Sequence, residues 1–171
     1  NETLNPLEKQ RRSAHDTRRL GLGIMGIADM FNQLGIDYDS EKGINLLEKI
    51  SSFVANHSYR ASAHLAEEKA PSPIFNYGKY KENPFFNEAI DDETRTIVKE
   101  KGLRNVAILS IAPTGTISNV ILSYKNKDKH YVGVSSGIEP VFALYYTRRS
   151  ESFGNKMFKV FHSTVKAYLD K

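Results

Sequence analysis

The sequence predicts an α/β fold that is rich in helix and has few strands. Three features carry this prediction: a long amphipathic stretch after residue 40, a shorter polar stretch that ends before Gly102, and the run NVAILSIAP, Asn105–Pro113. The first two have helical periodicity, whereas the continuous aliphatic run is typical of a strand covered on both faces. A length of 171 residues suits one domain and hardly two, so residues 1–171 are expected to form a single segment.

The first half of the chain is expected to be helical. Residues 5–19 are highly charged and nearly free of β-branched side chains, which predicts an exposed helix. Apolar residues recur at helical spacing over 22–34 and predict a buried helix that the following glycine ends. A long helix is expected to begin at an N-cap from Asp39 or Ser40 and to run to about Glu68, before two prolines stop it.

The second half is expected to mix loops, strands and helices. Residues 74–89 are rich in Asn, Pro and aromatic side chains and predict an ordered loop, and 91–101 predict a short polar helix closed by a glycine. After the aliphatic run, two more strands are expected at 131–134 and 141–146. Apolar residues at helical spacing over 153–169 predict a last amphipathic helix.

Composition narrows the classes of function. The formal net charge of +4 and the pI of about 9.2 permit a phosphorylated ligand, but the basic residues are mixed with acids, so nucleic-acid binding is not expected. The sequence contains no cysteine, which excludes disulfides, thiolate metal sites and a cysteine nucleophile within these residues. Neither a membrane-spanning run nor a signal peptide is visible, and a cytoplasmic protein is expected.

The stretch GLGIMG, Gly21–Gly26, fits the pattern G-x-G-x-x-G of dinucleotide-binding folds. That fold requires a strand before the glycines and an acidic residue about 20 positions later, at the end of the next strand. Here the preceding residues are RRSAHDTRRL, too charged for a buried strand, and the acid at that distance, Glu41, is expected at a helix start. We therefore interpret Gly21, Gly23 and Gly26 as structural residues that let a helix pack tightly against a neighbour.

The stretch APTGTIS follows the aliphatic run and is the strongest candidate for a site. Its glycine allows the backbone to approach a ligand closely, and its three hydroxyl side chains are hydrogen-bond donors. The chemistry suits a phosphate cradle without the lysine of a Walker A loop, or equally a strand-to-helix turn without a ligand. The candidate phosphate-binding residues are Ala112, Pro113, Thr114, Gly115, Thr116, Ile117 and Ser118.

The remaining polar candidates favour structural roles. The five histidines lack ligand spacing, although His57 and His64 share one helix face, so a metal site is not expected. Glu139 and the pair Arg148–Arg149 are interpreted as structural or solvated, because neither lies on a glycine-bearing turn. The basic run from Lys125 to Tyr131 is interpreted as a surface loop in preference to a nucleic-acid contact.

Three motifs together give a resemblance to a known family. RRLGLGIMGIADMFNQLG, NVAILSIAPTGTIS and SSGIEPVFALYYTRR occur in this order, and at about this spacing, in the large catalytic subunit of ribonucleotide reductases. The resemblance covers about residues 17–168. The form P-T-G-T-I-S is most similar to the adenosylcobalamin-dependent class, with the class that uses a metal-radical small subunit as the alternative.

The resemblance implies a fold and a function for the segment. The family forms a ten-stranded α/β barrel and converts ribonucleotides to deoxyribonucleotides by radical chemistry. This segment resembles part of the second half of the barrel, and residues 112–118 resemble the loop that holds the substrate phosphates. The family's catalytic cysteines, Asn and Glu have no counterpart here, so no residue is expected to be catalytic, and the segment alone is expected to be inactive.

The resemblance also implies partners. The expected partners are a ribonucleotide substrate and the remainder of the reductase chain or a partner subunit. Self-association is a further option, since half a barrel exposes sheet edges. The alternative is a non-catalytic binding or assembly module that keeps the reductase sequence without its chemistry.

Overall fold

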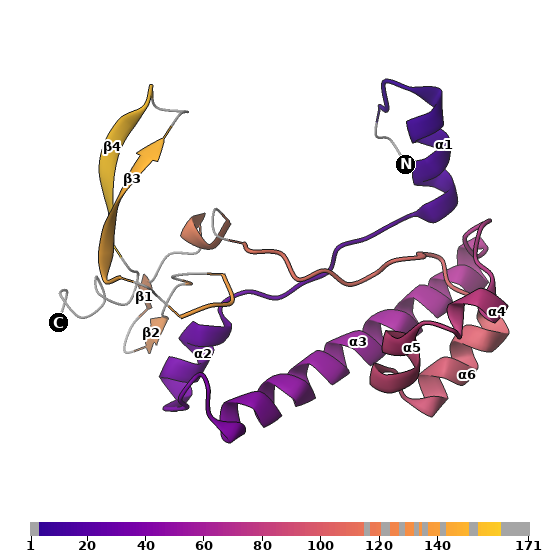
Figure 1. The fold of residues 1–171 in the computed structure, drawn as a ribbon, viewed down its shortest axis with the longest axis horizontal. Helices are drawn as coiled ribbons and strands as arrows, with labels where there is room; N and C mark the ends of the chain where they lie inside the picture. Colours follow the sequence, from indigo (N-terminus) through magenta and orange to yellow (C-terminus); the bar gives the residue numbers. More distant parts are fainter. Residues whose placement is uncertain are drawn as a thin grey trace. The chain divides into compact units, whose positions relative to one another are not determined.

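The computed structural model describes residues 4–114, 117–120, 124–126, 129–131, 134, 137–140, 143–150 and 154–161. The chain divides into two compact units. Unit 1 comprises residues 1–23 and 45–111, and unit 2 comprises residues 24–44 and 112–171. Figure 1 labels the helices and strands. The first part of the chain is mostly helical, as the sequence predicts.

Unit 1 is built from helices at the positions that the sequence predicts. The exposed helix α1 spans Glu8–Thr17, α3 spans Glu41–Lys69 and continues from unit 2 into unit 1, and α6 spans Asp92–Lys101. The N-cap of α3 is Ser40, whose Oγ accepts a hydrogen bond of 3.1 Å from the Gly43 N–H. These boundaries lie close to those expected from capping residues and periodicity.

The predicted loop over 74–89 is wrong, because this stretch forms two short helices. They are α4, Tyr77–Tyr80, and α5, Pro84–Ala89. Each is capped by an asparagine: Asn76 accepts from the Lys79 N–H, and Asn83 accepts from the Phe85 N–H. Asn-capped single turns have too few residues to show a helical period, which explains why the pattern indicated a loop.

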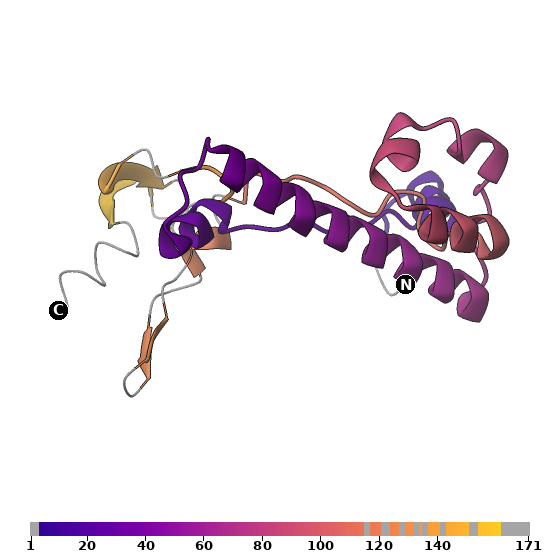
Figure 2. The ribbon, with the colours of Figure 1, turned by 90° about the horizontal axis from the view of Figure 1, so that it is seen from below.

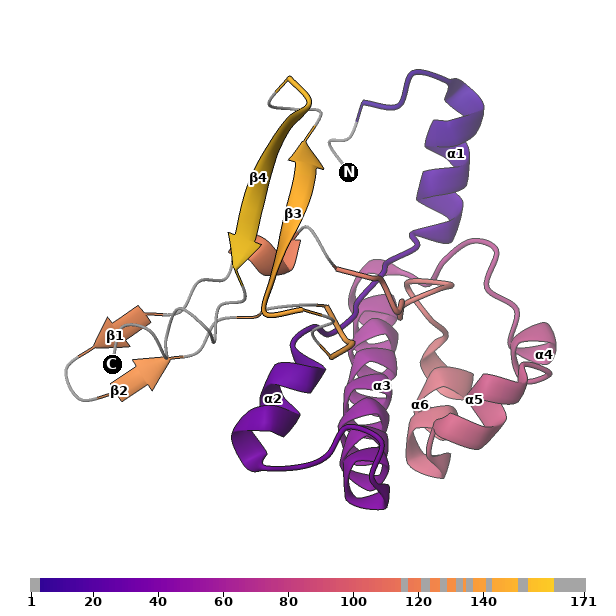
Figure 3. The same ribbon diagram turned by 60° about the vertical axis from the view of Figure 1, so that its left-hand side comes forward.

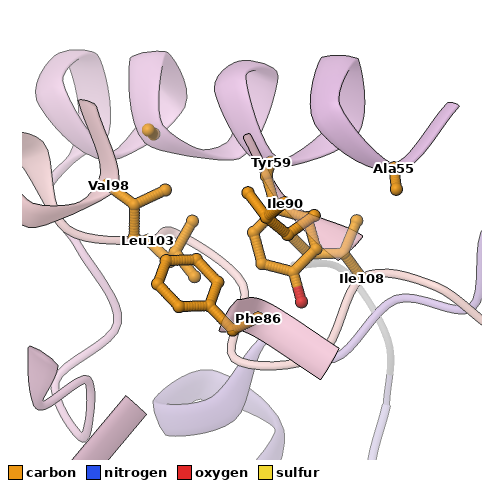
Figure 4. Packing of buried hydrophobic residues seen from close by; sticks show 8 residues of the cluster. Ala55, Tyr59, Phe86, Ile90, Val98, Leu103 and Ile108 are labelled. Carbon is orange, nitrogen blue, oxygen red and sulfur yellow. The ribbon is translucent and has the colours of Figure 1, made fainter. Parts of the chain in front are cut away.

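The core of unit 1 lies between α3, α5 and α6 (Figure 4). Phe86 of α5 is fully buried, and its ring lies 5.8 Å from that of Tyr59 and 5.1 Å from that of Tyr80. The Tyr59 and Tyr80 hydroxyls share a hydrogen bond of 3.0 Å, and burial raises the pKa of both phenols. The other fully buried side chains of the cluster come from α3, α6 and the segments that flank α6: Ala63, Ile90, Val98 and Leu103.

The aliphatic run forms one half of a short parallel pair. The Leu20 N–H donates to Ala107 O at 2.8 Å, the Leu22 N–H donates to Ile108 O at 2.8 Å, and the Ser110 N–H donates to Leu22 O at 2.9 Å. Only the bridge between Leu22 and Leu109 has strand character, so the regular strand predicted over Asn105–Pro113 is wrong in extent. The run has a backbone partner on one side, residues 20–22, and two paired segments without further strands form only a short hydrogen-bond ladder.

The pairing also corrects the predicted helix over 22–34. Residues 18–26 form no helix, Leu22 pairs with Leu109, and the buried helix α2 spans Ile27–Leu34. Gly21 and Gly23 therefore face the partner segment and not a packed helix: a Cβ at position 23 would collide with the carbonyl oxygen of Ser110. Gly21 and Gly23 act through close approach to Ser110, whereas Gly26 is the N-cap of α2 with a φ of +79°.

A buried polar network fixes the start of the aliphatic run. Ser62 of α3 donates to the Asn105 side chain at 2.9 Å and accepts from the Asn105 N–H at 3.1 Å. The Asn105 amide then donates to Arg18 O at 2.7 Å. Arg104 donates to Ala70 O at 2.9 Å and to Lys69 O, and so satisfies carbonyls at the end of α3.

Unit 2 contains α2, a short 3-10 helix η1 (Ile117–Val120) and two antiparallel hairpins. In one hairpin β1, Tyr124–Asn126, pairs with β2, Lys129–Tyr131 (Figure 2). In the other, β3, Tyr145–Ser150, pairs with β4, Lys156–Phe161 (Figure 3). None of the helices in the described part of the chain has the length and apolar character needed to span a membrane.

The strand pattern in unit 2 differs from the prediction. Of the strands expected at 131–134 and 141–146, the described residues Tyr131, Tyr145 and Tyr146 lie in β2 and β3, and residues 132, 133, 141 and 142 lie outside the described residues. β4 occupies part of the helix expected over 153–169, of which residues 162–169 also lie outside the described residues. The connection from β3 to β4 spans residues 151–155, and its last two residues, Gly154 and Asn155, have positive φ, +66° and +61°, directly before β4. This connection pairs the Lys156–Phe161 stretch with β3, and pairing outweighs its helical spacing.

Removing the cap of α6 gives the first testable prediction. Asp91 accepts from the Thr94 N–H at 2.7 Å and from Arg60 at 2.9 Å. Burial raises its pKa, but the hydrogen bonds from Thr94 and Arg60 outweigh burial and hold the pKa below the usual value. Asp91→Ala is therefore expected to cost about 1 kcal/mol of stability at neutral pH, measured by urea unfolding.

The pH dependence of Asp91 supplies the control for this prediction. A lowered folded pKa stabilises the protein above the unfolded pKa of about 4, and this contribution is lost as the pH falls through the folded pKa. Asp91→Asn keeps a good N-cap and removes the titrating group, so its stability should fall less than that of the parent on acidification. An equal fall in both proteins would contradict this assignment.

Candidate phosphate-binding loop

The candidate loop, residues 112–118, lies in unit 2, directly after Ile111, which is 89% exposed. Ala112, Pro113 and Ile117 are also exposed, whereas Ser118 is buried. Gly115 and Thr116 lie outside the described residues. Exposed residues therefore lie on both sides of Gly115 in the sequence: Ala112 and Pro113 before it, and Ile117 after it.

Thr114 is the residue of the described loop with an unusual backbone conformation. It has a φ of +53°, in the left-handed region that favours glycine. Its carbonyl accepts a hydrogen bond of 3.0 Å from the Ser118 N–H, and its hydroxyl donates to Pro113 O at 2.8 Å. A left-handed residue of this kind can form part of a backbone turn whose N–H groups bind an anion.

Gly137 lies against this loop, and Gly26, from a distant part of the sequence, is hydrogen-bonded to Gly137. The backbone of Gly137 packs against Pro113 and Thr114, and its carbonyl accepts a hydrogen bond of 2.6 Å from the Gly26 N–H. Gly26 has a φ of +79° and is the N-cap of α2. Sequence reasoning missed Gly137, whose only signal was its place in the motif SSGIEP, close to Glu139.

The glycine motif at residues 21–26 has the wrong surroundings for a dinucleotide. As expected from their charge, the residues before Gly21 form no strand: α1 covers Glu8–Thr17, and residues 18–20 lie outside strands. In addition, Asp29 in the first turn of α2 is 4% exposed, and a buried acid there opposes a pyrophosphate at that helix end. Glu41 is the first residue of α3, as predicted, and does not end a strand.

The other polar candidates are dispersed. His57 stacks on Phe53 with ring centroids 3.9 Å apart, and His64 lies 3.3 Å from Lys101 Nζ. Within the described ranges, no group of three or more His, Asp or Glu side chains could hold a metal ion. Glu139 is exposed and has an interaction partner, and Arg148–Arg149 lie within β3.

The basic run at 125–131 takes part in the β1–β2 hairpin. Lys125 pairs in register with His130, and Tyr124 pairs with Tyr131. The interpretation of this run as a surface loop is therefore wrong for the residues in the two strands. Residues 127 and 128 between them lie outside the described residues.

Comparison with known families decides the identity of the segment. The family model described as "Ribonucleotide reductase, barrel domain" matches residues 2–171. The chain belongs to the ribonucleotide reductase barrel family. The resemblance seen in the three motifs is thereby confirmed, and the helix-rich segment with few strands is one part of this reductase barrel domain.

Individual reductases agree with the family match. The chain is 37% identical over 143 residues to the vitamin B12-dependent ribonucleoside-diphosphate reductase of Thermoplasma acidophilum, and 32% identical over 143 residues to the reductase of that name from Mycobacterium tuberculosis. It is 26% identical over 165 residues to the ribonucleoside-diphosphate reductase subunit alpha of Chlamydia muridarum. Each match covers 84% of this reductase segment, but only 15%, 17% and 14% of the respective relatives.

Proposed function

We propose that this chain is part of an enzyme that reduces ribonucleotides to deoxyribonucleotides by radical chemistry. In this proposal residues 1–171 form one segment of the second half of a ten-stranded α/β barrel. Residues 112–118 bind the phosphates of a ribonucleoside diphosphate or triphosphate. The segment supplies no catalytic residue, because it contains no cysteine to carry a radical or to donate electrons.

The observation that carries the proposal is the geometry around Thr114. Thr114 has a positive φ and its carbonyl accepts a hydrogen bond from the Ser118 N–H, in a stretch whose sequence contains a glycine and two further hydroxyl side chains. Backbone N–H groups and hydroxyls are the donors that bind phosphate without a charged side chain. Exposure of Ala112, Pro113 and Ile117 leaves the frame accessible to a ligand.

The names of the relatives bear on the radical-generating cofactor. The relatives from Thermoplasma acidophilum and Mycobacterium tuberculosis are named as vitamin B12-dependent, so we propose adenosylcobalamin for the whole enzyme, with a metal-radical small subunit as the alternative. We assign no residue of this segment to either group. The candidate loop offers backbone and hydroxyl donors, which suit an anion, and the described residues contain no metal-binding cluster.

The partners follow from the same proposal. The segment needs the remainder of the reductase chain, or a partner subunit, to complete the site and to supply thiols. A second candidate function is a non-catalytic assembly module. The extended pair formed by residues 20–22 and 107–110 favours it, because a pair of this kind has backbone edges that another chain can complete.

Replacing Gly115 tests the loop in the full-length reductase. Gly115→Val is expected to weaken binding of CDP and ADP by about tenfold to a hundredfold, because a β-branched residue restricts the backbone and moves the neighbouring donors. Isothermal titration of the parent and variant measures the dissociation constants. Parent-like affinity in a folded variant would show that the loop does not bind the phosphates.

Gly154→Val is the matched control. Gly154 lies in the β3–β4 turn with a φ of +66°, and a Cβ there would meet no atom within 4 Å. The control strains a turn in the same unit without touching the candidate loop, so it should keep parental affinity. A non-catalytic module is favoured if neither CDP nor ADP binds to the full-length parent.

A further inference from the structure

We propose that Gly137 is a positioning residue for the phosphate loop. Its backbone fills the space behind Pro113 and Thr114 so closely that any side chain at position 137 displaces the loop. The inference rests on the proposed function of residues 112–118, and it adds a residue from a different motif to that site.

The first observation is steric. A Cβ at position 137 would overlap the carbonyl oxygen of Pro113 and would lie 2.5 Å from Thr114 Oγ1 and 3.0 Å from the Pro113 carbonyl carbon. Two of these three atoms belong to the backbone, so no rotation of a flexible side chain relieves the overlap. The φ of Gly137 lies outside the left-handed region, which makes the requirement for glycine one of space and not of backbone conformation.

The second observation is that Gly137 is held from its other side. Its carbonyl accepts the hydrogen bond of 2.6 Å from Gly26, and the Gly26 carbonyl in turn accepts from the Met30 N–H at 2.9 Å, in the first turn of α2. A side chain at 137 therefore has to push either against the start of α2 or against the loop. The start of α2 is a hydrogen-bonded helix end with buried Ile27 and Ala28, so the exposed loop is the part that yields.

Displacement of the loop has a defined consequence. Thr114 has the left-handed φ and the carbonyl that accepts from the Ser118 N–H, so a shift of Thr114 disturbs the described residues of the loop on both sides of Gly115. Misplacement of binding groups by about 1 Å costs up to about a hundredfold in catalytic efficiency. The loss should appear in affinity for the phosphate-bearing ligand, because the nucleoside end does not touch this junction in the proposal.

The test is Gly137→Ala in the full-length reductase, with Gly35→Ala as control. Gly35 ends α2 with a φ of +63° and open space around its Cα, so its substitution strains the same unit without a collision. Gly137→Ala is expected to weaken the binding of CDP and of ADP by the same factor, about tenfold or more. Gly35→Ala is expected to keep the parental affinity. Equal affinity of the two folded variants would overturn the proposal.

A second variant covers the case in which Gly137→Ala does not fold. Adding Thr114→Gly removes the contacting hydroxyl and frees the backbone at position 114, so that the Pro113 carbonyl can turn away from position 137. The double variant is therefore expected to fold and to bind CDP no more tightly than Thr114→Gly alone. A double variant that stays unfolded shows that freeing the loop does not relieve the collision, and it overturns the proposal.

Gly115→Val separates failure of the positioning role from failure of the site. If Gly115→Val weakens CDP binding and Gly137→Ala does not, only the positioning role fails. If Gly115→Val also leaves CDP binding unchanged, the loop is not the phosphate site, and the proposals for the loop and for Gly137 are overturned together.

Discussion

Phe86→Ala is expected to destabilise unit 1 by about 3–5 kcal/mol, a large fraction of the stability of an ordinary domain. Phe86 is fully buried among three tyrosine rings, Tyr59, Tyr77 and Tyr80, and it is the buried residue of α5. Truncation removes the burial of one ring and leaves a cavity between α3, α5 and α6. Because interiors are close-packed, the surrounding helices collapse only partly into such a cavity.

Hydrogen exchange of the α6 amides measures this loss, because local opening reports the stability of the unit to which the amides belong. The matched control is Phe85→Ala, at the preceding residue of the same helix, where the side chain is 44% exposed against 0% for Phe86. The control should change α6 protection by less than about 1 kcal/mol. Equal effects at the two positions would mean that α5 does not insert Phe86 into the core.

Gly23→Ala is expected to destabilise the extended pair by about 3 kcal/mol, because it adds overpacking to a lost backbone hydrogen bond. The new Cβ would collide with the carbonyl oxygen of Ser110. The neighbouring Ser110 N–H donates to Leu22 O at 2.9 Å, so the two segments cannot separate to make room without breaking their pairing. Thermal unfolding and exchange of the amides around residue 110 measure the effect.

Gly21→Ala is the matched control within the same segment. A Cβ at position 21 would lie 3.3 Å from Ser110 Cβ, so a shift of a few tenths of an ångström makes room, whereas at position 23 the Cβ would overlap the Ser110 carbonyl oxygen. Its expected cost is below about 1 kcal/mol. If Gly21→Ala is as damaging as Gly23→Ala, the glycines act through backbone freedom and not through close approach to Ser110.

Much of the candidate site was predictable from the sequence. The stretch APTGTIS has a glycine and three hydroxyl side chains after an apolar run, and these groups suit phosphate binding. The family match agrees with the resemblance of the three motifs. The contribution of Gly137 was not predictable, because its environment comes from Pro113 and Thr114, more than twenty residues earlier. No local pattern reports a contact made across such a separation.

The long helices of the chain were predictable because the interactions that define their ends are local. Ser40 and Asp91 cap α3 and α6 through neighbours three residues away, and Gly102 ends α6. The extended segments, in contrast, depend on tertiary pairing. Leu20–Gly23 follows a charged stretch, yet it pairs with residues 107–110. Lys156–Phe161 lies in a stretch with helical spacing, yet it pairs with β3. Strand pairing depends on hydrogen bonds to distant backbone, which propensity and periodicity do not record.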